Sequence, residues 1–206
     1  MTHVILVRHG QTAWNRAERF RGHSDVPLNS TGLSQAHAAA RRIVSTWRVD
    51  AVYTSPLRRA QETAQAIAQR CGLKAEPRDG LIDLNFGAWQ GLTFDEAAAA
   101  YPDEYALWQT KPQRLRLPGG ESMVRARRRA AATMLELASA HPDGTIVLVS
   151  HQVICRLLVL ATLGLSTAHY WQLRQETTAI NVFEYVNGGW ITVTVNDTCH
   201  LREGPQ

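Results

Sequence analysis

The sequence is poor in cysteine and has neither a long apolar run nor a large excess of charge. Its three cysteines, Cys71, Cys155 and Cys199, are far apart and odd in number, which argues against a disulfide framework and against a cysteine-ligated metal or redox site. The longest apolar stretch, residues 153–165, is interrupted by Arg156 and is too short to cross a bilayer. No signal-peptide pattern precedes the first apolar run. These absences predict a cytoplasmic protein that has no membrane partner.

The charge balance is mildly basic, with a formal net charge of +4 over 206 residues. This excess favours anionic ligands, but it is too small and too evenly scattered to indicate a nucleic-acid partner. The densest basic run, residues 125–129, includes Arg127, Arg128 and Arg129 on a predicted helix. We interpret this run as a solvent-exposed helix face.

Short apolar runs alternate with longer helical patterns, as is typical of βα units around a mostly parallel sheet. Strands are predicted at 3–7, 50–54 and 145–149, with a short one near 75 and a closing hairpin at 178–196 that turns at "NGG". Helices are predicted at 30–47 with Ser30 or Thr31 as the cap, from Ser55 and Pro56 to about Cys71 with Gly72 after it, at about 122–141 and at 152–165. We expect an α/β fold, a three-layer sandwich whose central sheet is flanked by helices. The pattern indicates one domain over residues 1–206, with a small cap insertion at about 92–118.

Two of the predicted strands end in the same way. "HVILVRHG" and "TIVLVSHQ" both run from an apolar strand through one polar residue to a histidine, His9 in the first and His151 in the second. Ligands of open α/β sheets bind at the carboxyl ends of the strands, where both histidines are expected. A third strand is followed by Arg58 and Arg59 in the first turn of a helix, at the end of the helix that favours anions. Buried structural histidines are a common alternative, but the arginines favour a phosphate pocket.

A phosphate pocket gives each of these side chains a chemical role. Arg8 and Arg59 can form charge-assisted bonds to phosphate oxygens, and His9 can attack phosphorus as a nucleophile. Arginines close to His9 lower its pKa, which keeps the attacking nitrogen unprotonated near neutral pH. The leaving alcohol needs a proton, for which Asp83 in "LIDLNFG" is the leading carboxyl. The alternative for Asp83 is a loop aspartate that bonds only to its local backbone.

The ordered set of motifs resembles the histidine phosphatase superfamily, the phosphoglycerate mutase-like proteins, in its branch of small bacterial phosphatases. The resemblance covers nearly the whole chain and rests on "LVRHGQTAWN", "FRGHSDVPLNSTGLSQA", "TSPLRRAQETA", "LNFGAWQG", "PGGES", "VSHQ" and "NDTCHL", in that order. It implies that His9 becomes phosphorylated, with Arg8, Arg59 and His151 around the phosphate and Asn15 joining from the first loop. It selects Arg59 over Arg58 and implies that Asp83 is the proton donor. It also implies a metal-independent enzyme without a cofactor, which agrees with the lack of metal-ligand spacing among the eight histidines.

Two positions depart from the family pattern. The proton donor is usually glutamate in these small enzymes, whereas aspartate at position 83 is shorter by one C–C bond, about 1.5 Å. Gln152 follows His151 where a glycine is common. We predict phosphate or substrate contacts for Arg21, Gly22 and Gln152 in addition to Asn15.

The resemblance favours a phosphomonoesterase that hydrolyses small phosphate esters through a phosphohistidine. The alternatives are a phosphoglycerate mutase, an α-ribazole phosphatase and a weakly active regulator that binds a phosphorylated ligand. A phosphoserine phosphatase ranks lower, because the family members with that activity resemble one another in having a histidine near the position of Phe86 in this sequence. Tyr101, Tyr105 and Trp108 are candidates for packing on an apolar alcohol, and Arg114 and Arg116 for meeting a second negative charge. Exposed residues of the final hairpin are a candidate contact for a homodimer.

Overall fold

A single mixed sheet organises the chain in the computed structural model, which describes residues 1–202. Within these residues its order is β3-β2-β4-β1-β5-β6. Strands β1, β2, β3 and β4 run parallel, and β5 and β6 form an antiparallel hairpin at one edge. The strands are β1 (Thr2–Arg8), β2 (Ala51–Thr54), β3 (Ala75–Pro77), β4 (Thr145–Ser150), β5 (Ile180–Val186) and β6 (Gly189–Asp197). The predicted strands and the predicted hairpin are therefore confirmed.

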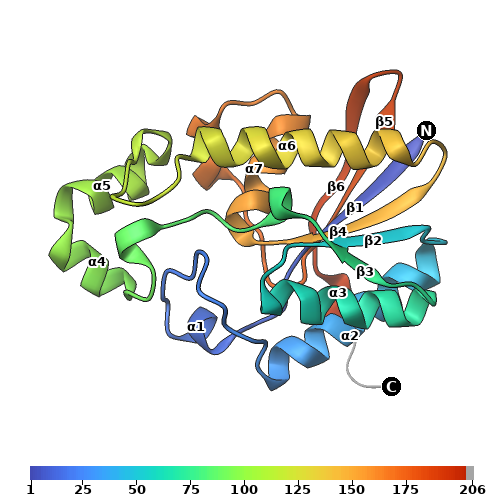
Figure 1. The fold of residues 1–206 in the computed structure, drawn as a ribbon, viewed down its shortest axis with the longest axis horizontal. Helices are drawn as coiled ribbons and strands as arrows, with labels where there is room; N and C mark the ends of the chain where they lie inside the picture. The colour runs from blue at the N-terminus through green and yellow to red at the C-terminus, as the bar shows by residue number, and fades with distance from the viewer. Residues whose placement is uncertain (203–206) are drawn as a thin grey trace.

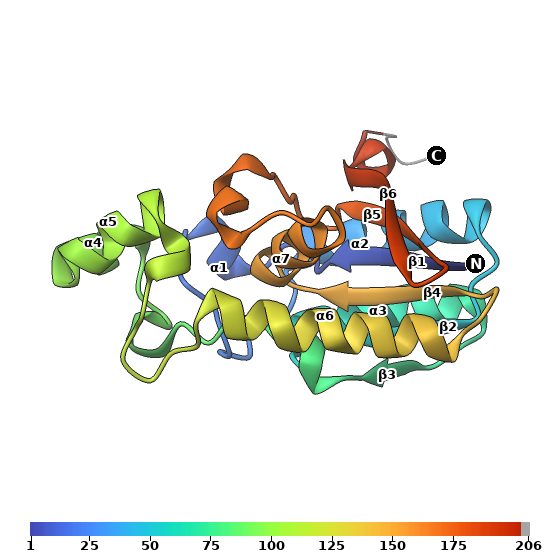
Figure 2. The same cartoon turned by 90° about the horizontal axis from the view of Figure 1, so that it is seen from above.

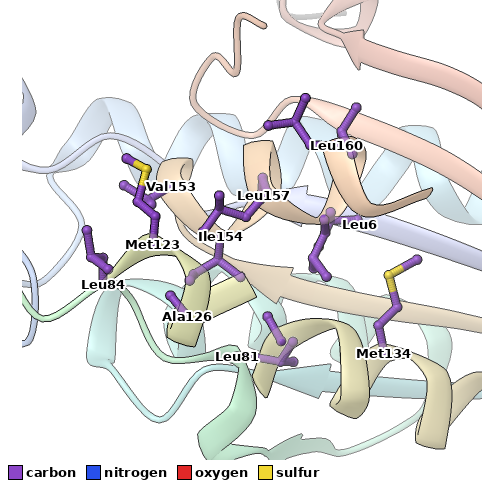
Figure 3. Close-up of a cluster of buried hydrophobic side chains, with 14 of the residues drawn as sticks. Leu6, Leu81, Leu84, Met123, Ala126, Met134, Val153, Ile154, Leu157 and Leu160 are labelled. Atoms are coloured by element: carbon purple, nitrogen blue, oxygen red, sulfur yellow. The ribbon is translucent and has the colours of Figure 1, made fainter. Parts of the chain in front are cut away.

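Two layers of helix enclose the sheet. Figure 1 shows α6 (Met123–Ala140) and α7 (Gln152–Thr162) on one side of the parallel strands and α2 (Ser30–Thr46) and α3 (Arg58–Cys71) on the other. Because successive strand residues face opposite sides, Val4 and Leu6 pack under α6 and α7 while Ile5 and Val7 pack under α2 and α3. Figure 3 shows the first of these clusters, with Leu6 beside side chains of α6 and α7. This arrangement confirms the three-layer sandwich.

The segment between β3 and α6 extends past the carboxyl ends of the parallel strands. It contains α4 (Phe94–Ala100) and α5 (Pro102–Thr110), which Figures 1 and 2 show at the opposite end of the molecule from the start of β1. Backbone bonds from Phe20 to Leu92 and from Phe94 to Glu18 join this segment to the loop that contains α1 (Ala13–Arg16). The helices of residues 92–118 therefore lie over the same edge of the sheet as His9.

Three helix boundaries differ from those predicted. Helix α2 is capped by Asn29, whose side chain accepts the N–H of Gly32, so Ser30 is the first helical residue and not the cap. Helix α3 begins at Arg58 because Asp25, from a separate loop, accepts the N–H of Arg58 and replaces a local cap. Helix α7 ends at Thr162, three residues early. A cap supplied from elsewhere in the chain leaves no local sequence signal.

The remaining boundaries agree closely with the predictions. Gly72 follows α3 in the left-handed conformation, with φ of 69°, and Ser122 caps α6. Within residues 1–202 no helix combines the length and the apolar character needed to cross a membrane. Strand β6 lies at the free edge of the sheet and exposes Ile191 and Val193 to solvent. The homodimer contact predicted for the final hairpin would therefore involve these two side chains.

Candidate active site

The sheet register brings His9 and His151 together. Strands β1 and β4 are parallel neighbours, and Arg8 pairs with Ser150, so the two histidines that follow these residues leave the sheet side by side. Their ring centroids are 5.2 Å apart, and both side chains are fully buried. The identical strand endings in the sequence therefore indicated a real spatial pair.

His9 presents one ring nitrogen without a protein partner. Its Nδ1 lies 2.7 Å from the carbonyl oxygen of Gly10, which can only accept, so Nδ1 carries the proton and Nε2 keeps its lone pair. The Nε2 atom is buried and has no hydrogen-bond partner among residues 1–202. Burial lowers the pKa of His9 well below 6.5, and the positive charges of Arg59, Arg8 and Arg21 lower it further. His9 is thus a neutral imidazole with a free nucleophilic nitrogen.

Two buried arginines are fixed beside His9 by backbone carbonyls. Arg8 donates from Nη1 to the carbonyl of Gln175, while Arg59 donates from Nη1 to Ser24 and from Nη2 to Gly22, both at 2.8 Å. Burial lowers the pKa of Arg8 to about 9, with a smaller contribution from the nearby charge of Arg21. Because this value lies well above neutral pH, the Arg8 guanidinium remains cationic. Burial also lowers the pKa of Arg59, and the Asp83 carboxylate opposes this shift.

Five buried nitrogens in this region lack a hydrogen-bond partner within the described residues. They are His9 Nε2, His151 Nδ1 and the Nε atoms of Arg8, Arg21 and Arg59. Unpaired buried polar groups cost about 1–3 kcal/mol each, so their concentration at one place indicates a bound ligand that completes them. Because three of the groups are cationic, the ligand with matching chemistry is an anion that has several acceptor oxygens.

Asp83 lies at the edge of this cluster. Its Oδ2 accepts from Arg59 Nη2 at 3.1 Å and lies 3.7 Å from His151 Nδ1. Its Oδ1 accepts the N–H of Leu84 at 2.9 Å, so the local backbone bond expected of a loop aspartate is also present. The side chain is 5% exposed. The only carboxyl predicted from the sequence as an acid therefore touches the arginine that faces the nucleophile.

A residue that the sequence did not reveal orients His151. The Ser55 hydroxyl, at the end of β2, lies 2.7 Å from His151 Nε2. When the hydroxyl donates to Nε2, the proton of the ring resides on Nδ1, the nitrogen that faces Asp83 and the anion pocket. Burial lowers the pKa of His151 well below 6.5, and the positive charge of Arg59 lowers it further. The sequence placed Ser55 only as a helix cap, and its partner is 96 residues away.

The other predicted binding residues have distinct local roles. Asn15 uses Oδ1 to accept the backbone N–H and the hydroxyl of Thr12, which caps α1, so contact with an anion would fall to its Nδ2. Gly22, at φ of 49°, offers its carbonyl to Arg59. Arg21 and Gln152 line a cavity beside Asp83.

That cavity has a volume of about 340 Å³ and a largely aromatic wall. The aromatic residues on the wall are Phe20, Phe86, Phe94, Tyr105, Trp108, Tyr170 and Trp171. The sequence analysis named Tyr105 and Trp108 but missed the last two, which follow α7 in the chain and reach Trp108 through ring contacts of 5.6 and 5.2 Å.

Two further sequence predictions can be compared with the site. Tyr101 packs against the ring of Trp89 at 6.3 Å instead of facing the cavity. Arg114 and Arg116 are exposed, and Arg116 donates to carbonyls of its own turn. Among residues 1–202 no three His, Cys, Asp or Glu side chains are grouped in a way that would hold a metal ion.

The interpretation of residues 125–129 as a solvent-exposed face is wrong for Arg129. Its side chain is 23% exposed and donates to Glu121 and to the backbone around Asp83. Arg125 and Arg128 are exposed, as expected. Helical periodicity explains the difference, because Arg129 is placed beside the buried stripe formed by Ala126 and Ala130.

We expect the buried neutral histidines to make folding sensitive to acid. Because the pKa of His9 and of His151 is lower in the folded protein than in the unfolded chain, the unfolded chain takes up more protons as the pH falls below about 6.5. Stability is therefore lost as the pH falls, by up to about 1.4 kcal/mol per pH unit for each histidine. Urea unfolding in phosphate-free buffer at pH 7 and pH 5 measures this loss. His9→Gln should reduce the loss and His37→Gln, on the surface, should not; equal losses in all three proteins would contradict the assignment.

Comparison with known proteins agrees with the geometry. A model of the histidine phosphatase superfamily (branch 1) matches residues 4–198. Phosphoserine phosphatase 1 of Hydrogenobacter thermophilus is 31% identical over 203 residues, covering 98% of this chain and 96% of that protein. A probable phosphoglycerate mutase of Yersinia pestis is 33% identical over 210 residues, covering 98% of this chain and 95% of that protein. The solved structure of Bacillus stearothermophilus YhfR superposes with a TM-score of 0.94 at 26% identity, covering 98% of this chain and 100% of that one. The chain therefore belongs to branch 1 of the histidine phosphatase superfamily.

Proposed function

We propose that this protein hydrolyses phosphate monoesters through a phosphohistidine formed on His9 Nε2. The observation that carries the proposal is the set of five buried, unpaired nitrogens on His9, on the neighbouring His151 and on the three arginines whose charges act on His9. A phosphoryl group has three acceptor oxygens and a negative charge, so it supplies what these donors lack. The remaining nitrogen, His9 Nε2, is an electron pair donor of the kind that attacks phosphorus.

The proposed reaction has two steps. In the first, His9 Nε2 forms a bond to phosphorus, the ester P–O bond breaks, and the leaving alkoxide takes a proton from Asp83. In the second, Asp83 takes a proton from water, the water oxygen bonds to phosphorus, and the P–N bond breaks to return neutral His9 and inorganic phosphate. Arg59 contacts Asp83 at 3.1 Å and also faces the phosphate, so it ties the acid to the reacting group.

The aromatic cavity beside Asp83 supports an apolar or aromatic leaving alcohol as the preferred substrate class. The alcohol departs toward the group that protonates it, and Asp83 is on the cavity wall. Phe94 from α4 and Tyr105 and Trp108 from α5 supply part of that wall, which supports the role of residues 92–118 as a cap that selects the leaving group. A phenyl ring buried here is worth about 2 kcal/mol, or about 30-fold in kcat/KM.

A panel of phosphate esters tests this proposal. We expect release of inorganic phosphate from all esters that react, and a kcat/KM about 30-fold higher for benzyl phosphate than for ethyl phosphate. Phosphoserine and 3-phosphoglycerate complete the panel. Conversion of 3-phosphoglycerate to 2-phosphoglycerate without phosphate release would identify a mutase instead. Binding of phosphate without turnover of any ester would identify a non-catalytic binding protein.

A further inference from the structure

The segment that carries Asp83 contains a single 3-10 turn, Asp79–Leu81, and side chains from outside hold its backbone carbonyls. Four consecutive carbonyls, those of residues 80–83, each accept a hydrogen bond from a side chain outside the loop. Ser150 binds the carbonyl of Leu81 at 2.7 Å, and Arg129 binds the other three, at 2.9 Å for Gly80, 2.7 Å for Ile82 and 2.9 Å for Asp83. One arginine of α6 therefore supports most of this loop.

The guanidinium group of Arg129 has no donor left for a ligand. Its Nε and Nη2 bind the two carboxylate oxygens of Glu121 at 2.9 and 2.8 Å, and the remaining contacts go to the loop. An arginine has five N–H donors, and these two bonds with the three to the loop use all of them. The Glu121 carboxylate also balances the charge. The Arg129 guanidinium therefore holds the loop of Asp83 in place and has no hydrogen-bond donor available for a substrate.

We propose that Arg129, held by Glu121, is a positioning residue that sets the reach of the Asp83 carboxyl toward the leaving alcohol. The proposal rests on the role of Asp83 in the proposed function. Aspartate has one methylene, so the position of its carboxyl depends closely on the position of its backbone. Arg129 binds the backbone carbonyl oxygen of Asp83 itself, two bonds from the Cα that carries the acid. His23 Nε2 lies 3.0 Å from the same oxygen and supports it from the opposite segment of the chain.

Two esters with different leaving groups can distinguish a variant that displaces the acid from a variant that destabilises the whole fold. A 4-nitrophenolate ion departs readily without a proton, whereas the alkoxide of benzyl phosphate needs one, and the two esters carry rings of similar size. Displacement of a catalytic group by about 1 Å can cost about 10²-fold in rate. A defect confined to Asp83 should therefore lower kcat/KM for benzyl phosphate and leave kcat/KM for 4-nitrophenyl phosphate nearly unchanged. This parameter covers only the steps up to release of the alcohol, and it excludes hydrolysis of the phosphohistidine, in which Asp83 acts equally for both esters.

The test compares kcat/KM of the protein for these two esters. We expect Arg129→Gln to lower kcat/KM about 10²-fold for benzyl phosphate and less than about threefold for 4-nitrophenyl phosphate. Glu121→Gln should act in the same direction with a smaller effect, and Arg128→Gln, on the exposed face, should leave both values unchanged. The double variant Asp83→Asn/Arg129→Gln should be no more selective between the esters than Asp83→Asn, because both changes remove one function.

The outcomes distinguish this proposal from the proposed function. If Asp83→Asn discriminates between the esters but Arg129→Gln and Glu121→Gln lower both rates equally, Arg129 has only a structural role and the proposal fails. If Asp83→Asn itself does not discriminate, the assignment of the acid fails and the proposal fails with it. Circular dichroism and urea unfolding show whether each variant is folded, and Arg129→Lys, which keeps the charge without the planar fork, should give an intermediate selectivity.

Discussion

The His9→Ala variant should lose turnover of every phosphate ester by about 10³-fold or more, because it removes the atom that bonds to phosphorus. The variant should keep its fold. The substitution removes the bond from Nδ1 to the Gly10 carbonyl, but it also removes Nε2, an unpaired buried polar atom whose burial has a cost. We expect the free energy of unfolding to be unchanged or higher, as is common when an active-site group is removed.

Steady-state kinetics with 4-nitrophenyl phosphate measure this loss, and mass spectrometry of the quenched enzyme detects the intermediate. The wild-type protein should gain the mass of one phosphoryl group during turnover, and the tryptic peptide that contains His9 should carry it. His37→Ala changes an exposed histidine and should behave as the wild type does. Normal turnover by His9→Ala, or a phosphoryl group on another peptide, would show that the nucleophile is wrongly assigned.

The nucleophile was predictable from the sequence because its position depends on local pattern and on one general property of parallel sheets. The strands ending at Arg8 and Ser150 were recognisable as apolar runs, and parallel strands end at the same edge. This reasoning placed His9 and His151 at the same edge, and the pairing of β1 with β4 in the structure places them side by side. The same reasoning located Arg58 and Arg59, because a helix start after a strand lies at that edge as well, and the family resemblance selected Arg59.

The supports of the site were not predictable in the same way. Ser55 orients His151 from 96 residues away, and Asp25 caps α3 from a separate loop. Arg129 belongs to a run of arginines whose neighbours are solvent-exposed, and only the rotation of α6 against the loop of Asp83 separates it from them. Such contacts depend on how distant segments pack together, and no local pattern in the sequence indicates which segments will meet. They determine how well the site works, while the local pattern determines which residues form it.

The Asp83→Asn variant should lose about 10²–10⁴-fold in kcat/KM for benzyl phosphate, the usual contribution of a general acid, and little in kcat/KM for 4-nitrophenyl phosphate. Asparagine keeps the size of the side chain and an oxygen that can accept from Arg59 or from Leu84, whose bonds to Asp83 are 3.1 and 2.9 Å. The fold and the phosphate pocket should therefore be preserved. What asparagine lacks is a proton that it can give to the alkoxide and take from water.

Asp83→Glu is the companion variant, because it restores an ionisable carboxyl but moves it outward by about 1.5 Å, the length of one C–C bond. Both oxygens of Asp83 already have partners, and the residue is 4% exposed, so the longer side chain must give up at least one of these bonds. We expect its kcat/KM with benzyl phosphate to lie between those of the wild type and Asp83→Asn, and therefore its discrimination between the two esters to be intermediate as well. Equal loss with both esters in Asp83→Asn would mean that the carboxylate acts through Arg59 on the phosphate and not as an acid. Recovery by glutamate of the benzyl rate alone would identify proton transfer as the function of this position.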